Sequence, residues 1–566
     1  MESRKLLECV PNFSEGRNME IIHHITGEIK AVKGVDLLDI DAGRDANRTV
    51  VTFIGPPDEV VTAAFRAVKK ASQLIDMRQH MGEHPRFGAT DVCPLVPVSG
   101  LTMDDAVEYA RVLARRIGEE LQIPVYCYEY AALKNERKNL ANSRSVEYEG
   151  LKEKLSDPQW KPDFGPDIFN ARSGATAVGA RDFLVAYNIN LNTTSIRKAN
   201  AVAFDIREKG RVKKNSEKPG NQPLRDENGN PLRIPGSLKA VKGMGWYLKE
   251  YGIAQVSLNL TNIHVTPVHK AFEEACRKAE ARGLRVTGSE LVGLIPLEAL
   301  LEAGRYFLKK QKKSTGLPEK ELIKIAIRSL GLNDLYPFSP ENKIIEYKLS
   351  RHRKDKWVNT TLTEFLDQTA SDSVIPGGGP VTAYLGALGA ALGTMVANVS
   401  ANNTEREDQR EGLSHWAEKG IALQTELIQL MEEDGEAYRQ IIRAQKMPQQ
   451  TADEKEKRKL AVQEAFENAT RVPYKVMETA YTILEVINAI VDKGIPNALP
   501  DAGVGAFAAV AAVKGAFLNI QSNTRIIDDQ LFVKEMLTKG YATKQRTEAL
   551  EQIIVATIED RTWKQP

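Results

Sequence analysis

The sequence predicts an α+β N-terminal half of two ferredoxin-like (split βαβ) subdomains, followed by an all-α C-terminal helical domain. Three observations support this class. Short β-rich runs alternate with amphipathic helical runs up to about residue 348, the order β-α-β-β-α-β occurs twice in that region, and the remainder reads as helices throughout. At 566 residues, the chain is long enough for several domains of about 150 residues each.

Composition and charge are those of an ordinary globular protein. Hydrophobic residues make up 42% and charged residues 27%, and the net charge of +2 argues against a nucleic-acid partner. The four cysteines form no CxxC pair, which favours a reducing, cytoplasmic environment and offers no zinc knuckle. The N-terminus lacks the apolar run of a signal peptide. Because Lys514 interrupts the apolar run 503–520, we expect a buried helix there and no membrane partner.

The first subdomain is predicted from residue-type runs and their periodicity. Its elements, in order, are a strand at 6–10, a helix at 18–32, strands at 35–41 and 48–55, a helix at 58–75 and a strand at 91–98. Asn18 stands where the first helix needs an N-cap. Prolines remove backbone donors, so Pro94 and Pro97 predict that the last strand lies at a sheet edge.

The second subdomain repeats the same element order. Its elements are a strand at 183–191, a helix at 195–207, strands at 239–248 and 253–262, a helix at 267–283 and a strand at 284–294. The polar segment 207–237, rich in Gly, Pro, Asn and Lys, predicts a long loop that is either mobile and solvated or a lid. Two such units side by side leave a cleft between them.

A charged linker at 350–357 separates the α+β half from the helices. No proline occurs from Val381 to Met447, and alanine, leucine and glutamate dominate there, which predicts long helices. The predicted boundaries are 1–183 for the first subdomain, 184–349 for the second, 350–357 for the linker and 358–566 for the helical domain.

Three turns of the first subdomain are unusually polar. They contain Asn12, Ser14, Glu15 and Arg17; then Asp39, Asp41, Arg44, Asp45, Asn47 and Arg48; and finally His84. Turns favour Asp, Gly and Asn in any protein, and a lone histidine is usually a surface residue. Pro85 keeps His84 out of a helix. Because loops in a split βαβ sheet can approach one end of the sheet, a carboxylate can meet His84 there and make a proton shuttle.

A glycine-rich segment at 163–183 is predicted to join the two αβ units. Gly165 and Gly174 let the backbone approach a ligand closely, and Asn170 and Arg172 supply polar contacts. The segment is not a G-x-G-x-x-G motif after a strand, which argues against a dinucleotide site. A plain connection between the units is the alternative.

One helix seam in the C-terminal half contains a single acid. The seam alternates spacings of four and three, and consists of Trp416, Gly420, Leu423, Leu427, Leu430, Asp434, Ala437 and Ile441. A carboxyl group in an apolar seam has a raised pKa, which suits an acid that protonates a departing amine. The alternative for Asp434 is a structural salt bridge. The turn 376–380 lacks the ending of a phosphate loop and predicts either a tight turn or N–H groups that bind a ligand carboxylate.

Long motifs in both halves resemble one known family. Residues 8–18, 74–94, 162–166 and 245–257 resemble the formiminotransferase half of formimidoyltransferase-cyclodeaminases, and residues 376–400 with the helices after them resemble the cyclodeaminase half. The resemblance implies a bifunctional folate enzyme of histidine degradation. Such an enzyme transfers the formimino group from N-formimino-L-glutamate to tetrahydrofolate and releases L-glutamate. It then cyclises 5-formiminotetrahydrofolate to 5,10-methenyltetrahydrofolate and releases ammonia.

The resemblance also implies site residues and partners. The family's transferase histidine falls on His84, its partner aspartate on Asp41 and its cyclodeaminase aspartate on Asp434. The folate-contacting stretch matches Gly165, Pro166, Asp167, Ile168, Phe169, Asn170, Ala171, Arg172, Ser173 and Gly174. Tetrahydrofolate, with or without a polyglutamate tail, is then a co-substrate, no metal is expected, and the chain forms a homo-oligomer such as an octamer. The loop 207–237 looks longer than in shorter members, which leaves contacts there open.

The implied chemistry agrees with the residue types. A histidine between the N5 of tetrahydrofolate and the leaving glutamate nitrogen can move one proton from the first to the second, and Asp41 can orient it. Arginines such as Arg44, Arg48 or Arg86 can hold the glutamate carboxylates in a bidentate fork, and the sequence does not choose among them.

Three alternatives stay open at this point. The helical domain could serve oligomerisation alone, with Asp434 idle. The chain could be a non-catalytic folate-binding scaffold, or it could transfer a formyl group from N-formylglutamate. Ammonia release from 5-formiminotetrahydrofolate separates the bifunctional enzyme from the first two.

Overall fold

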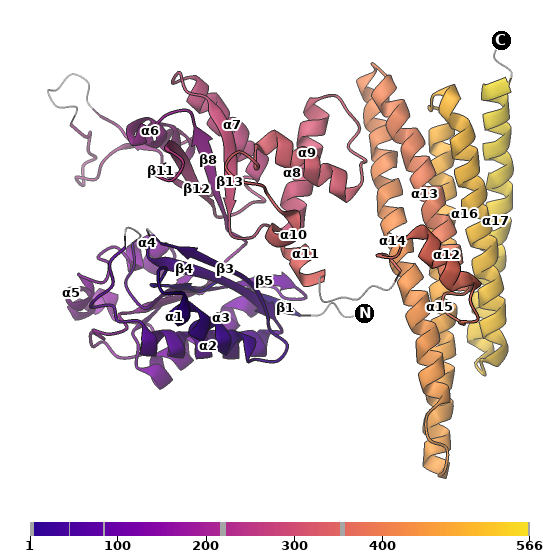
Figure 1. Ribbon diagram of the computed structural model, residues 1–566, viewed down its shortest axis with the longest axis horizontal. Coiled ribbons are helices and arrows are strands. Elements are labelled where there is room, and N and C mark those ends of the chain that lie inside the picture. The colour runs from indigo at the N-terminus through magenta and orange to yellow at the C-terminus, as the bar shows by residue number, and fades with distance from the viewer. Residues whose placement is uncertain (1–4, 45, 83–84, 215–221, 351–356, 564–566) are drawn as a thin grey trace. The chain divides into compact units, whose positions relative to one another are not determined.

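The computed structural model describes residues 5–44, 46–82, 85–214, 222–350 and 357–563 (Figure 1). It contains two compact units, one made of residues 1–300 and 330–352 and the other of residues 301–329 and 353–566. The first is mixed α/β and the second is helical, which confirms the predicted class in outline. Residues 301–329, predicted as part of the second subdomain, group with the helical unit.

Seven strands form the first sheet. They are β1 (Leu6–Cys9), β2 (Asn12–Phe13), β3 (Asp36–Gly43), β4 (Arg48–Gly55), β5 (Thr90–Ser99), β6 (Val125–Glu129) and β7 (Thr176–Ala180). β3 pairs with β4, and β4 pairs with β1 and β2, which follow one another along it. β5 lies on the other side of β1 and β2, and β7 and β6 extend the sheet in parallel.

Helices cover one face of this sheet (Figure 1). They are α1 (Met19–Lys30), α2 (Pro57–Leu74) and α3 (Met103–Leu121). Two shorter helices, α4 (Leu140–Ser143) and α5 (Leu151–Ser156), come later in the chain and do not belong to this layer. Asn18 caps α1 as predicted, because its Oδ1 accepts hydrogen bonds from the amides of Glu20 and Ile21. The apolar faces of α1–α3 and the facing strand residues form one core. On the opposite face, Leu151 and Leu155 of α5 pack against Val92, Tyr126 and Ala177, so that face is covered near β6 and β7.

The prediction that the strand at 91–98 is an edge strand is wrong. β5 is central, with β1 and β2 on one side and β7 on the other. Pro94 gives up one donor, but its carbonyl still accepts the amide of Val10 at 3.1 Å. Pro97 lies beyond the residues that pair with β7, so its missing N–H costs that ladder nothing.

The second sheet has four antiparallel strands in the order β11-β12-β8-β13. They are β8 (Val185–Leu191), β11 (Val241–Leu248), β12 (Ile253–Leu260) and β13 (Val286–Val292), with helices α6 (Ile196–Ile206) and α7 (Val268–Glu280) between them in the chain. In the polar segment predicted as a loop, β9 (Arg211–Val212) and β10 (Arg233–Ile234) pair as a small ribbon. Residues 215–221 of that segment lie outside the described residues.

Short helices follow the second sheet. They are α8 (Leu297–Lys310), α9 (Glu319–Leu330), α10 (Pro340–Lys343) and α11 (Ile345–Ser350). Ile345 of α11 is buried against Leu38 and Ile54 of the first sheet. The end of the α/β unit therefore returns to the sheet with which the chain began.

The helical unit is built from long helices that run alongside one another (Figure 1). They are α12 (Leu362–Ala370), α13 (Gly378–Asn403), α14 (Glu407–Gln445), α15 (Ala452–Val491), α16 (Leu499–Asn523) and α17 (Gln530–Trp563). Capping boxes start α12 at Thr361 and α15 at Thr451. Trp357, from the segment predicted as a linker, is buried in the core of this unit.

Helix α16 contains the apolar run 503–520. By length and composition alone, α13 and α16 could each cross a membrane, but the core helices of soluble proteins pass the same test. α16 packs against α13, α15 and α17, and 50% of its most apolar window is buried. The structure thus agrees with the predicted buried helix.

Candidate active sites

Strand register places Asp41, Asn12 and Arg48 on one face of the first sheet. Asp41 and Asn12 both pair with Val50, from opposite sides, so the three side chains share a face. Arg48 lies two residues from Val50 along β4 and shares that face. Its neighbour Val51 points to the core under α1–α3. The polar residues therefore occupy the face that those helices leave open.

Asp41 is half-buried on this open face. Burial raises its pKa above the ordinary value, Lys343 partly offsets the rise, and Asp39 and Glu290 add to it. Glu290 belongs to β13 of the second sheet, and Lys343 belongs to α10, which comes after that sheet in the chain. Asp41 therefore lies near charged groups from both αβ parts.

The open face of the second sheet is also polar. Gly245 packs directly against α6, and its cross-strand partners Val256 and Ile189 share that covered face. The alternate residues point the other way and form a network. Gln255 donates to Asn190 Oδ1 at 2.8 Å and to Glu290 Oε2 at 3.2 Å. The sequence carried a signal for it, because polar residues alternate with apolar ones along β8 and β12.

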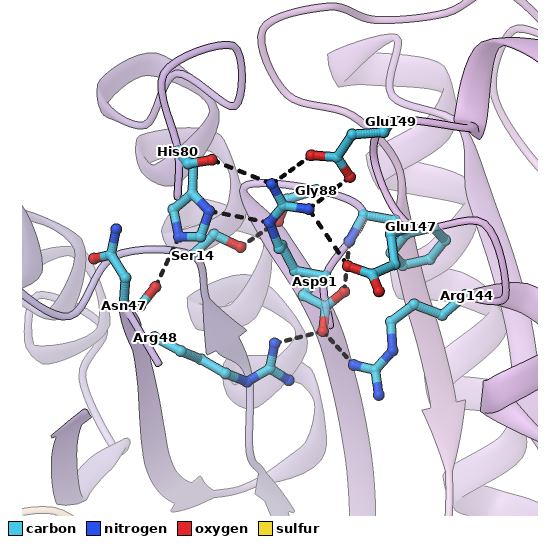
Figure 2. A network of polar contacts seen from close by, with 11 residues as sticks. Ser14, Asn47, Arg48, His80, Gly88, Asp91, Arg144, Glu147 and Glu149 are labelled. Atoms are coloured by element: carbon cyan, nitrogen blue, oxygen red, sulfur yellow. Dashed lines mark hydrogen bonds and ion pairs between the residues drawn. The ribbon is translucent and has the colours of Figure 1, made fainter. Parts of the chain in front are cut away.

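A second network holds the segment on either side of the predicted His84 (Figure 2). Arg86 Nε donates to His80 Nδ1 at 3.1 Å, so this nitrogen is the acceptor and His80 Nε2–H donates to the Asn47 carbonyl at 2.8 Å. Burial lowers the pKa of His80, which keeps the ring neutral. Arg86 also donates two hydrogen bonds to the Glu149 carboxylate, at 2.7 and 2.8 Å. His84 itself lies outside the described residues.

Asp91 is the centre of a charged cluster below that segment (Figure 2). Its Oδ2 accepts from Arg48 at 2.5 Å and from Arg144 at 2.6 Å, and its Oδ1 accepts the amide of Phe87 at 3.0 Å. Burial alone would raise the pKa of Asp91, but the two guanidinium groups hold it below the ordinary value. The carboxylate is therefore charged and shared between two cations.

The glycine-rich segment does not join the two αβ units, contrary to prediction. It leads into β7, a strand of the first sheet, so it lies within the first subdomain. Gly165 and Gly174 both have positive φ, at +81° and +65°. Gly174 packs against Phe87 and Gly88, whereas Arg172 donates to carbonyls at the end of α2. One end of the segment therefore lies beside the polypeptide that carries His84.

The helical unit contains the pocket predicted around Asp434. A cavity of about 190 Å³ is lined by Asp434, Gly435 and Tyr438 of α14, by the turn 377–380 and by Asn519 of α16, among others. A Cβ on Gly379 would lie 2.0 Å from Asp434 Oδ2, so only glycine lets the turn rest on this carboxyl group. Desolvation raises the pKa of Asp434 to about 6. The predicted seam is buried along α14 on both sides of this acid.

Asn519 is a residue of this pocket that the sequence analysis missed. Its Nδ2 is buried and has no hydrogen-bond partner among the described residues, although the side chain lines the cavity. Asn523, one turn further along, donates instead to the carbonyl of Ala469 at 2.7 Å. A buried unpaired donor costs about 1–3 kcal/mol, so its presence in a cavity points to a ligand acceptor. Asparagines in helices are common, which is why the sequence carried no signal.

Family models match nearly the whole chain in three consecutive segments. The formiminotransferase domain's N-terminal subdomain matches residues 6–181, the formiminotransferase domain matches 186–350, and the formiminotransferase-cyclodeaminase model matches 361–541. A formimidoyltransferase-cyclodeaminase from Gallus gallus is 40% identical over 98% of this chain and 99% of its own length.

The chain belongs to the formimidoyltransferase-cyclodeaminase family.

Relatives of each half also exist as separate proteins. A glutamate formimidoyltransferase from Thermoplasma acidophilum is 41% identical over 54% of this chain and 92% of its own length. A methenyltetrahydrofolate cyclohydrolase from Methylorubrum extorquens is 32% identical over 36% of this chain and 98% of its own length. The two halves of a formimidoyltransferase-cyclodeaminase are thus similar to proteins that stand alone.

The roles assigned to these residues stay predictions, and the structure describes the places of Asp41 and Asp434 but not that of His84. Asp41 lies on the open face of the first sheet and Asp434 lines a cavity. Arg144 and Asp91 were not singled out from the sequence. Arg144 follows the short helix α4 in a polar stretch without periodicity, and Asp91 looked like the start of an ordinary strand.

Proposed function

We propose that the chain is a bifunctional folate enzyme of histidine degradation. It transfers the formimino group from N-formimino-L-glutamate to tetrahydrofolate, releasing L-glutamate, and then cyclises 5-formiminotetrahydrofolate to 5,10-methenyltetrahydrofolate, releasing ammonia. The observation that carries this proposal is the similarity to named formimidoyltransferase-cyclodeaminases over essentially the full length of both chains. Tetrahydrofolate is a co-substrate in this scheme, and we propose a cytoplasmic homo-oligomer.

In the transfer step, N5 of tetrahydrofolate attacks the formimino carbon and the bond from that carbon to the glutamate nitrogen breaks. N5 loses a proton and the leaving nitrogen gains one, so a single acid/base residue serves both events. We assign this residue as His84 and the residue that orients it as Asp41. The raised pKa of Asp41, caused mainly by burial, and its place on the open sheet face support a position beside substrate.

In the cyclisation step, N10 attacks the same carbon and the formimino nitrogen departs as ammonia. N10 loses one proton, and the formimino nitrogen must gain two to leave as ammonia, one equivalent to the proton that N10 loses and one from an acid. Asp434 suits this task because desolvation raises its pKa to about 6, which leaves a useful protonated fraction near neutral pH. The exposed turn amides at the start of α13 border the same cavity and can bind a polar edge of the folate.

The test is an assay of both products with the purified chain. We expect L-glutamate from formiminoglutamate and tetrahydrofolate, and ammonia from 5-formiminotetrahydrofolate supplied directly. Glutamate release without ammonia release would leave the helical half with an oligomer-forming role alone. Release of neither product would overturn the proposal.

Folate should protect the segment 165–174 from amide hydrogen exchange. The carbonyl and side chain of Asn170 already accept the amides of Gly174 and Ser173, so ligand-dependent protection is expected at 167–172. The measurement is exchange with and without saturating folate, with the exposed turn 281–283 as an internal control. Equal exchange at 167–172 in both conditions would remove this segment from the folate site.

Asn519→Leu should lower cyclisation while stabilising the fold. Leucine keeps a similar volume but cannot donate to the ligand, so kcat/KM for cyclisation should fall about 3- to 10-fold, as for one neutral hydrogen bond. The melting temperature should rise, because the variant removes a buried donor that has no partner among the described residues. Cyclisation at the wild-type rate would show that Asn519 does not contact the substrate.

We also propose that both αβ parts are ferredoxin-like. The second sheet supports this with the element order β8-α6-β11-β12-α7-β13 and the strand order β11-β12-β8-β13. In the first sheet, β1, β3, β4 and β5 take the corresponding places, and β7 and β6 are an addition. In each sheet, the polar residues lie on the face opposite the two helices of this motif.

A further inference from the structure

Among the arginines that the sequence suggested for binding the donor's carboxylates, Arg86 has no donor to spare. Its Nε donates to His80, its Nη1 to Glu149, and its Nη2 to Glu149 and to the carbonyl of His80. Glu147 lies 3.5 Å from it as a further counter-charge. Arg86 is thus a structural residue that fixes the segment around it.

Arg48 and Arg144 are placed differently. Both donate through Nη1 to the same Asp91 oxygen (Figure 2). Arg48 Nε also donates to Asn12 Oδ1 at 3.1 Å. No described residue accepts from Arg48 Nη2 or from Arg144 Nε and Nη2, and none of these nitrogens is sealed off from solvent. Arg144 was not among the candidates that the sequence suggested.

The charges of this cluster do not balance. Two guanidinium groups share one carboxylate, which leaves an excess of one positive charge among these three residues. The side chains of Arg48, Arg144 and Asp91 are only 9%, 17% and 0% exposed, so water screens the excess poorly. Burial, together with the repulsion from Arg144, lowers the pKa of Arg48 despite the attraction of Asp91. A second anion at this place would remove an unfavourable charge.

The cluster lies where a substrate would be. Arg48 pairs with Gly43 across β3 and β4, and Asp41 lies two residues from Gly43 on the same face. The amide of Phe87 fixes Asp91 to the segment that follows His80 and Arg86. The free donors therefore face the same side of the sheet as Asp41.

We propose that Arg48 and Arg144 form a carboxylate subsite that holds one carboxylate of the amino-acid part of the formimino donor. Asp91 holds the two planar guanidinium groups in place, and their remaining N–H groups bind the carboxylate by charge-assisted hydrogen bonds. The subsite deepens the proposed transferase function and rests on it. Because tetrahydrofolate also ends in a glutamate moiety, the test separates the two sources of a carboxylate.

The first measurement is steady-state kinetics of formimino transfer by Arg144→Gln, with Arg144→Lys as the conservative variant. Loss of a charge-assisted bond should raise the KM for the donor about 10- to 100-fold, with a small change in kcat and in the KM for tetrahydrofolate. The lysine variant should recover part of the loss. Arg277→Gln, which removes an exposed arginine paired with Glu274, is the matched control and should behave as wild type.

The second measurement is product inhibition, which a merely structural role of Arg144 would not change in the same way. In the wild type, L-glutamate should inhibit more strongly than either its γ-amide, glutamine, or its α-decarboxylated analogue, 4-aminobutyrate. In Arg144→Gln, L-glutamate should inhibit no better than whichever analogue lacks the carboxylate bound by the subsite.

The outcomes separate this subsite from the transferase function itself. A wild type that releases no glutamate overturns the proposed transferase function. If the wild type is active but Arg144→Gln keeps its donor KM, the subsite is overturned alone. A rise in the KM for tetrahydrofolate in place of that for the donor also overturns it, because the cluster would then bind the folate tail.

Discussion

Asp434→Asn should lower cyclisation of 5-formiminotetrahydrofolate by roughly 10²- to 10⁴-fold, the contribution expected of one general acid. Asparagine keeps the shape that lets Gly379 rest on the side chain, so the cavity should persist. It cannot protonate the departing nitrogen. Glutamate release should continue, and 5-formiminotetrahydrofolate should accumulate in the assay. Glu433→Gln, next in the chain but off the apolar seam, is the control.

The pH dependence of the same pair of proteins gives an independent measurement. Because desolvation raises the pKa of Asp434 to about 6, the protonated fraction falls as pH rises through that value, and wild-type kcat/KM for cyclisation should fall with it. The folded state also holds this proton more tightly than the unfolded chain. As pH rises from about 4 to about 6, the free energy of unfolding of the wild type should therefore fall, and that of Asp434→Asn should not. Cyclisation by the variant at the wild-type rate would reduce Asp434 to a polar spacer.

His84→Ala should abolish glutamate release while leaving cyclisation of supplied 5-formiminotetrahydrofolate intact. Alanine can neither accept the N5 proton nor return it to the leaving nitrogen, and a loss of at least about 10²- to 10⁴-fold is expected. His84 belongs to a polar segment that His80 and Arg86 hold independently, so the substitution should leave the fold unchanged. The melting temperature checks this point.

A surface histidine provides the control for that experiment. His24 is 62% exposed and belongs to α1, on the helix-covered side of the first sheet, so His24→Ala should transfer the formimino group normally. If His84→Ala transfers the formimino group at a rate within about twofold of the wild type, His84 is not the acid/base residue. The acid/base residue would then have to be sought elsewhere on the open face, where Asp41 is a half-buried carboxyl group.

Local sequence patterns predicted individual helices and strands better than they predicted which elements lie next to one another. The helix periods, the Asn18 cap and the Asp434 seam are short-range features, and the structure contains each of them. Whether β5 is an edge strand depends on β7, which is formed more than 80 residues later, and the two prolines could not reveal that neighbour. The same holds for the glycine-rich segment, whose membership in the first sheet is a long-range pairing.

The candidate sites show the same limit. The sequence indicated Asp434 because one acid interrupts an apolar seam, and a seam can be read from spacing alone. It could not indicate Arg144 or Asn519. Arg144 is a candidate for anion binding because it shares the Asp91 carboxylate with Arg48. Asn519 is a candidate for ligand binding because its buried amide nitrogen has no partner among the described residues. Both are properties of three-dimensional pairing, and neither leaves a mark in the spacing of residues.

The proposed function places two chemistries at two separate sites, so 5-formiminotetrahydrofolate made by one chain should be a substrate for another. The most direct measurement is product formation by an equimolar mixture of His84→Ala and Asp434→Asn supplied with formiminoglutamate and tetrahydrofolate. Each variant alone should form almost no 5,10-methenyltetrahydrofolate. The mixture should form it and release ammonia, because one variant makes the intermediate and the other cyclises it. A mixture that releases glutamate and accumulates 5-formiminotetrahydrofolate, but yields no ammonia, would show that the two sites do not act in this way.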